Sequence, residues 1–186
     1  MKKIFALQTF LLFTSIVFAQ TKHEIADRKI KTVIVRTEDG RKGKPIFKTV
    51  LTRYDKHANV LEVIEYNKDS VLSKWEKYTY DKNDNETSYT QLDSSGKELQ
   101  KTVTLYDKWE NETEKISFDE TGKITEKIIS AYNNFNDKIS ETATDKDGKF
   151  LRKTVYEYES KGMLKSRKIY NADGRTIYSR ECNYKY

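Results

Sequence analysis

The chain has 186 residues, of which 34% are charged and 36% are hydrophobic, and its formal net charge is +6. Lysines and acids are interleaved along the whole chain, so there is no basic block of the kind that binds nucleic acid. The single cysteine, Cys182, excludes an intramolecular disulfide. The length suits one domain, held together by packing and backbone pairing.

Residues 1–19 have the features of a secretory signal peptide. Lys2 and Lys3 precede an apolar run from Ile4 to Phe18, and Ala19 offers a small residue at the cleavage position. The alternative is a membrane anchor, but the run is shorter than the ~20 residues that a spanning helix needs. We therefore expect export to the periplasm, the cell surface or the medium, with no stable membrane span after the signal is removed.

Residues 20–53 form an N-terminal segment that differs from the rest of the chain. We expect residues 20–28 to be loosely ordered and residues 30–53 to form an imperfect copy of the repeat described next. Glu38-Asp39-Gly40 supplies a turn, and Pro45, the only proline, suits an edge strand. Terminal copies of repeat proteins are usually atypical because they cap the stack, so we interpret this segment as a cap.

From residue 54 to residue 186 the chain repeats with a period of 26 residues, which predicts stacked copies of one small unit. One ladder consists of tyrosines, at Tyr54, Tyr80, Tyr106, Tyr132, Tyr158 and Tyr184. A second ladder lies 16 residues past the first five tyrosines, at Ser70, Gly96, Gly122, Gly148 and Gly174.

Each copy reads as a β-hairpin with two turns. In the copy that starts at Tyr80, a turn at residues 81–85 and a turn at residues 93–96 bound two polar runs without helical periodicity. Glycine at the end of the second turn accepts positive φ and closes a hairpin with a bulge. In the first turn we expect Asn59, Asn85 and Asn111 to take the left-handed conformation. Five repeats give ten strands.

These patterns predict an all-β fold of antiparallel β-hairpin repeats that form an extended twisted or partly curled sheet. The alternative is a sheet that closes on its tyrosine side. The strands are too polar for a thick core, so we favour a sheet wetted on both faces. We expect the tyrosine rings to cover neighbouring backbone while their hydroxyl groups stay in water.

The Tyr-Asp pairs at 54–55, 80–81 and 106–107, together with the glycine ladder, resemble the YD repeats of the RHS family. That resemblance implies an exported bacterial β-sheet protein. RHS proteins wrap a toxin in a shell, but this chain is too short to enclose a domain. The motif carries no catalytic residue to this chain.

Three aromatic residues are the candidate ligand-binding residues. Trp109 lies inside a turn, where packing rarely requires tryptophan, Phe135 occupies the same place one repeat later, and Trp75 is the other tryptophan. Such rings can stack on a sugar or insert into a partner, or they can fold back over the sheet.

The remaining candidate residues favour no chemistry. His23 and His57 have no recognisable nucleophile partner, and Cys182 reads as a half-buried small residue. Residues 81–86 resemble the opening of a calcium loop but lack its glycine and its closing glutamate. We expect no catalytic residue, metal or cofactor, and no nucleic-acid partner.

The sequence therefore predicts a non-enzymatic exported protein that offers an extended surface to an envelope or extracellular protein or polymer. The alternative is a carbohydrate-binding module that uses the turn aromatics.

Overall fold

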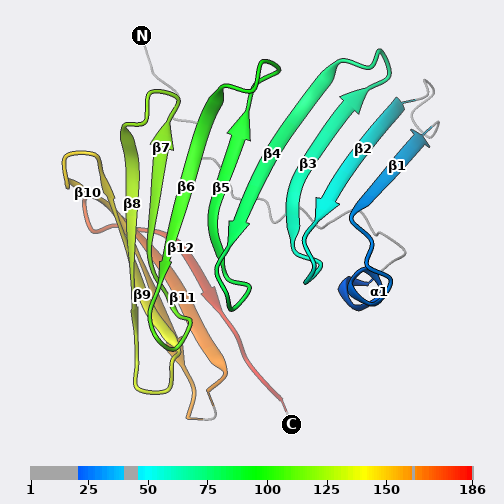
Figure 1. The fold of residues 1–186 in the computed structure, drawn as a ribbon. Helices are drawn as coiled ribbons and strands as arrows, with labels where there is room; N and C mark the ends of the chain where they lie inside the picture. Colours follow the sequence, from blue (N-terminus) through cyan, green and yellow to red (C-terminus); the bar gives the residue numbers. More distant parts are fainter. Residues whose placement is uncertain (1–20, 40–45, 161, 186) are drawn as a thin grey trace.

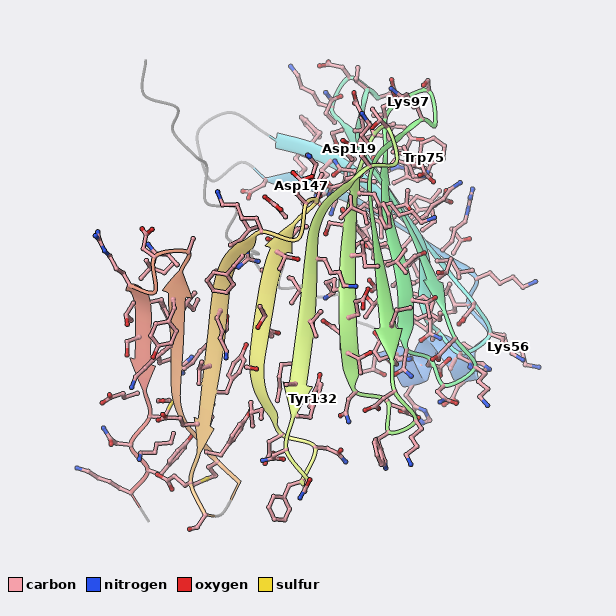
Figure 2. The ribbon with its side chains drawn as sticks, turned by 90° about the vertical axis from the view of Figure 1, so that its left-hand side faces the viewer. Lys56, Trp75, Lys97, Asp119, Tyr132 and Asp147 are labelled. Atoms are coloured by element: carbon pink, nitrogen blue, oxygen red, sulfur yellow. The ribbon has the colours of Figure 1, made fainter. Side chains whose placement is uncertain are left out.

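The computed structural model describes residues 21–39, 46–160 and 162–185, which form one helix and one antiparallel sheet of twelve strands. The strands follow one another in chain order, and the two outer strands, β1 and β12, are not paired with each other. The predicted all-β hairpin-repeat fold with an open sheet is confirmed. Figure 1 shows β1 to β7 broadside, and Figure 2, turned by 90°, shows β8 to β12 broadside, so the sheet twists and bends between its two ends.

The elements are α1 (Lys22–Asp27), β1 (Thr32–Asp39), β2 (Ile46–Tyr54), β3 (Val60–Asn67), β4 (Leu72–Tyr80), β5 (Glu86–Leu92), β6 (Glu98–Tyr106), β7 (Glu112–Asp119), β8 (Ile124–Tyr132), β9 (Lys138–Asp145), β10 (Phe150–Tyr158), β11 (Leu164–Asn171) and β12 (Thr176–Glu181). In the part of the chain that the structure describes, no helix is long and apolar enough to cross a membrane. The predicted signal peptide lies outside the described residues.

The helix α1 corrects the expectation that residues 20–28 are loosely ordered. Its first turn is closed by a capping box, in which the Glu24 backbone N–H donates to Thr21 Oγ1 (3.2 Å) and the Thr21 N–H donates to Glu24 Oε2 (2.8 Å). Ile25 is buried and packs in one cluster with Tyr54 and Ala58. The capping box and this apolar contact together order a segment that is too short to be a stable helix alone.

Strands β1 and β2 form an antiparallel pair ahead of the repeats, in the segment where we expected an imperfect copy. They pair without a bulge from Thr32↔Arg53 to Asp39↔Ile46. The turn between them and Pro45 lie outside the described residues. The Lys31 carbonyl accepts the Tyr54 N–H (2.9 Å), which fixes the start of β1 against the end of β2.

All ten turns between β2 and β12 share one hydrogen-bonding pattern. The N–H of the first turn residue donates to the carbonyl of the fifth, and the N–H of the fourth donates back to the carbonyl of the first. Residues with positive φ occupy the fourth place; they are Ala58, Ser70, Asp84, Gly96, Glu110, Gly122, Asn136, Gly148, Gly162 and Gly174. The left-handed glycines and their bulges are thus confirmed.

The predicted left-handed asparagines are wrong by one residue. Positive φ falls on Asp84 and Glu110, while Asn85 and Asn111 come next. The reason is that the left-handed fourth residue redirects the chain so that the carbonyl of the fifth residue can accept the N–H of the first. The fifth residue is free to use its side chain, and the Asn111 amide donates to Asp107 Oδ2 (3.1 Å).

The tyrosine ladder lies on one face of the sheet, since antiparallel partners share a face and alternate residues of a strand face the same way. Five of its six hydroxyl groups donate to the backbone carbonyl 20 residues earlier at 2.9 Å, so they bond within the sheet and not to water alone as we expected. The pairs are Tyr80–Val60, Tyr106–Glu86, Tyr132–Glu112, Tyr158–Lys138 and Tyr184–Leu164. Every acceptor directly follows the turn of the preceding repeat, so each ring ties one repeat to the one before it.

The core is thin and distributed over both faces. Thr104 and Ser130 are buried on the tyrosine face, and Ile64 and Thr90 are buried on the opposite face. No large side chain among the described residues is fully removed from solvent. The sheet is therefore stabilised mainly by its backbone ladders and by contacts between neighbouring strands.

Candidate binding edge

The turns lie along two opposite edges of the sheet. We call the edge formed by turns 55–59, 81–85, 107–111, 133–137 and 159–163 the tyrosine edge, because each turn directly follows a ladder tyrosine. The other edge, formed by turns 67–71, 93–97, 119–123, 145–149 and 171–175, is the glycine edge. Figure 2 shows Lys56 and Tyr132 toward the tyrosine edge and Lys97, Asp119 and Asp147 toward the glycine edge.

The two edges differ at the third residue of the turn. On the glycine edge this residue is small or acidic: Asp69, Ser95, Thr121, Asp147 and Asp173. The hydroxyl groups of Ser95 and Thr121 each bond the carboxylate of the first turn residue at 2.7 Å, so they support the turn. On the tyrosine edge the described residues at this place are His57, Asn83, Trp109 and Phe135, of which three carry rings.

The rings of Trp109 and Phe135 project into solvent. Trp109 is 61% exposed and Phe135 is 85% exposed. Their backbone N–H groups make the bond that the described residues at the third place of the other turns also make, here to Asp107 Oδ1 and Asn133 Oδ1 at 2.8 Å. Lys108 places its ammonium 4.2 Å from the centre of the Trp109 ring. The turns therefore form without these rings, which do not fold back over the sheet.

A groove of about 440 Å³ lies between the turn that carries Trp109 and the next turn on the tyrosine edge. It is lined by Asp107, Trp109, Asn111, Tyr132, Asn133, Asn134 and Asn136. The Asn111 amide crosses its floor and donates to Asn136 Oδ1 (3.1 Å). Among the described residues, the Asn134 amide and the Asn136 Nδ2 atom have no hydrogen-bond partner. The groove thus combines one exposed indole with several amide groups.

An equivalent groove of about 490 Å³ lies between the first two turns of the same edge, and it is charged. Asp55, Lys56, Asp81, Lys82 and Asp84 are among the residues that line it. The same inter-turn bond is present, from Asn59 Nδ2 to Asp84 Oδ1 (2.7 Å).

The ring residue of the charged groove, His57, contacts a carboxylate. His57 Nδ1 lies 2.7 Å from Asp84 Oδ1. The bonds from His57 and then Asn59 hold the pKa of Asp84 below its ordinary value. Within the described residues, no cluster of histidine, cysteine and acidic side chains is suited to a metal ion.

The structure places Trp75 away from Trp109 and Phe135. Its indole Nε1 donates to Glu62 Oε1 (2.7 Å), on the face opposite the tyrosine ladder. The ring also covers Gly96, where a Cβ atom would lie 3.6 Å from it. Figure 2 shows Trp75 near the glycine edge. Trp75 packs on the sheet, so the candidate edge contains only two of the three predicted aromatic residues.

Sequence reasoning missed the carboxylates of the tyrosine face. Oε2 of the buried Glu76 accepts from the Tyr78 hydroxyl (2.8 Å), and Oε1 accepts from the Tyr89 hydroxyl (2.9 Å) and lies 2.9 Å from Lys74 Nζ. Burial, with the Glu76 charge, raises the pKa of Tyr89 to about 12. Glu141 is bonded in a similar way by Tyr156. Since these oxygens are already satisfied, both carboxylates stabilise the sheet.

No family model matches the chain, and no curated protein matches it. The solved structures that resemble it include a porin-like protein from Bacteroides uniformis, at 13% identity and a TM-score of 0.42, with 75% of this chain and 54% of that chain covered. Another is the TcdB2-TccC3-Cdc42 structure, at 15% identity and a TM-score of 0.22, with 83% of this chain and 11% of that chain covered. A third is a protein of unknown function from Bacteroides fragilis, at 12% identity and a TM-score of 0.21, with 84% of this chain and 96% of that chain covered. The chain thus spans about half the length of the porin-like protein and about a tenth of the TcdB2-TccC3 chain.

Proposed function

We propose that this chain is a non-enzymatic exported β-repeat protein of the YD-repeat type, and that its tyrosine edge binds an extended partner in the cell envelope or outside the cell. The observation that supports this most is the exposure of Trp109 and Phe135 at equivalent places in successive turns. Exposed rings in register are typical of binding surfaces, since they offer apolar area to a partner at little cost in side-chain entropy.

The geometry of the sheet favours an elongated partner. Successive turns on one edge are two strands apart, so equivalent side chains recur about every 9.5 Å along it. A partner that lies across the strand ends meets the same backbone at each step. Repeat proteins use such surfaces for extended ligands because every copy adds a similar contact.

A sedimentation assay tests the binding edge. The mature chain, residues 20–186, is mixed with envelope fragments of a bacterium that expresses it and is then spun down. We expect the chain to sediment and the Trp109→Ser, Phe135→Ser double variant to stay in solution. Ile129→Ser, which removes a side chain 51% exposed in the middle of β8, is the control. Equal behaviour of all three chains contradicts the proposal.

Export is tested separately by expressing the full chain and sequencing the N-terminus of the protein found outside the cytoplasm. We expect Gln20 as the first residue. Recovery of a chain that begins at Met1 from the cytoplasm contradicts export.

A further inference from the structure

We propose that the ligand of the tyrosine edge is a linear polysaccharide of neutral sugars, which lies across the strand ends and stacks on Trp109 and Phe135. This inference rests on the proposed function, whose partner it identifies by chemical class. It follows from three features of the edge: its rings, its amide groups and its charge.

The rings provide the stacking platforms. A pyranose has faces of C–H groups that pack on an indole or phenyl ring, while its hydroxyl groups stay free for hydrogen bonds. Trp109 and Phe135 lie in turns that are two strands apart, or about 9.5 Å. That distance is close to the length of two sugar residues in an extended chain, so one polymer can contact both rings with a disaccharide between them.

The amides between the rings provide the hydrogen bonds. Asn134 and Asn136 are exposed at the groove, and the Asn134 amide and the Asn136 Nδ2 atom keep their bonding capacity toward solvent. Amides donate and accept, which suits hydroxyl groups that do both. Asn111 and Asn133 are occupied by turn bonds and hold the groove in shape.

The charge of the groove favours a neutral ligand. Four of its seven lining residues are asparagines, and its carboxylate, that of Asp107, is engaged by the N–H groups of Trp109 and Asn111. The groove at the first two turns has the same backbone but carries aspartates, lysines and His57 instead. The less charged groove is therefore the one that Trp109 lines, with Phe135 in its second turn, and the charged groove serves as an internal control.

Titration with sugars of defined length tests the inference. The probes are hexasaccharides and disaccharides of β-1,4-linked glucose and of β-1,4-linked N-acetylglucosamine, and binding is measured by calorimetry. We expect at least one hexasaccharide to bind more tightly than its disaccharide. Trp109→Ser and Phe135→Ser should each weaken hexasaccharide binding about tenfold.

Two variants separate stacking from folding defects. His57→Ser changes the same turn position in the charged groove and should bind as the unmodified chain does. Trp109→Phe keeps a ring and should retain most of the affinity that Trp109→Ser loses. Binding that is equal in all variants overturns the site, and a loss in His57→Ser equal to that in Trp109→Ser overturns its location.

The sedimentation assay distinguishes failure of the sugar from failure of the edge. If no hexasaccharide binds while the double variant still fails to sediment, the neutral-sugar ligand is wrong and the binding edge stands. Treatment of the fragments with periodate, which destroys sugars, or with protease then shows the class of the true partner. If sedimentation is also unaffected by the double variant, both proposals are wrong.

Discussion

The glycine edge and the tyrosine edge build the same turn from different residues. Four of the five glycine-edge turns place glycine at the left-handed position, where it costs nothing in sterics. Four of the five tyrosine-edge turns place Ala58, Asp84, Glu110 or Asn136 there, although a non-glycine residue in this conformation costs roughly 1–2 kcal/mol. The fold accepts that cost in four turns of the tyrosine edge but in only one described turn of the glycine edge, at Ser70.

The tyrosine edge has bonds that the glycine edge lacks. Ladder hydroxyls such as that of Tyr132 tie each repeat to the preceding turn, and the amides of Asn59 and Asn111 reach the next turn. These contacts compensate for poorer turn residues. They also leave the third position free for exposed rings, so the comparison indicates that the tyrosine edge carries side chains that folding does not require.

The largest expected effect is the difference in solubility between deleting a whole repeat and deleting half of one. Deletion of residues 106–131 rejoins Leu105 to Tyr132, which then occupies the place of Tyr106 and can donate to the Glu86 carbonyl. Each repeat contacts mainly its neighbours, so this variant should stay soluble and lose about one repeat's share of stability. Deletion of residues 106–118 instead removes one tyrosine-edge turn and one strand, which reverses every later strand. We expect that variant to aggregate.

Soluble yield and urea unfolding measure the difference between the two deletions. Aggregation of both to the same extent would show that the sheet behaves as a single closed core, and the repeat-by-repeat description of the two edges would be wrong.

A smaller effect is expected at the left-handed position itself. Gly122 has φ +78° with open space around its Cβ position, so Gly122→Val should cost about 1–2 kcal/mol through the backbone alone. Glu110 has φ +67°, so Glu110→Gly should stabilise the tyrosine edge by up to about 1 kcal/mol. Thr121→Ser keeps the hydroxyl and is the control. The urea midpoints of the variants are compared, and identical midpoints for Gly122→Val and Thr121→Ser would refute the prediction.

The hydroxyl group of a ladder tyrosine should contribute less to the free energy of unfolding than the left-handed glycine does. Tyr132→Phe removes the donor to the Glu112 carbonyl and leaves the ring in place, so we expect a loss of about 1 kcal/mol. Tyr170→Phe is the matched control, since the Tyr170 hydroxyl has no partner among the described residues. Urea unfolding of both variants at neutral pH is the measurement, and a Tyr170→Phe loss as large as that of Tyr132→Phe speaks against a specific role for the ladder.

Much of this arrangement was predictable from the sequence, and the rest depended on contacts between repeats. The 26-residue ladders predicted the hairpins and the glycine turns, because those follow from local backbone preferences. The polarity of the strands favoured the open sheet over a closed one. The ladder hydroxyl bonds span 20 residues, and the Asn111 bond to Asn136 spans 25, so no single turn motif reveals them.

Position within the sheet could not be predicted for the tryptophans. Trp75 and Trp109 are both flanked by polar residues, and only the strand register shows that one covers Gly96 while the other projects from a turn. Order in α1 was missed because the residue that Ile25 packs against, Tyr54, is far along the chain.

The turn carboxylates also make the stability of the sheet depend on pH, through the groups that bond each carboxylate. The Thr121 hydroxyl, with the N–H groups of Thr121 and Lys123, lowers the pKa of Asp119. A lowered folded-state pKa means stability that is present above the ordinary aspartate pKa and is lost as the pH falls through the folded value. Asp119→Asn removes this titration and keeps a turn-forming side chain, as Asn171 does in the equivalent turn.

Urea midpoints at neutral pH and at about pH 3 measure that response. We expect similar midpoints for Asp119→Asn and the unmodified chain at neutral pH, and a smaller acid loss in the variant. An unchanged acid loss would mean that other carboxylates control the response.

The smallest expected effect on stability is that of Trp109→Ser, and the comparison of the two edges depends on it most. Trp109→Ser removes a ring that is 61% exposed and makes no turn bond through its side chain, so the free energy of unfolding should change by no more than about 0.5 kcal/mol. Trp75→Ser removes the donor to Glu62 and the ring over Gly96, and it should cost on the order of 2 kcal/mol. Both variants replace the same residue type in the same sheet, so their urea midpoints can be compared directly. A loss in Trp109→Ser that matches the loss in Trp75→Ser would mean that the ring at the tyrosine edge supports the fold, and the argument that this edge carries residues for binding would no longer hold.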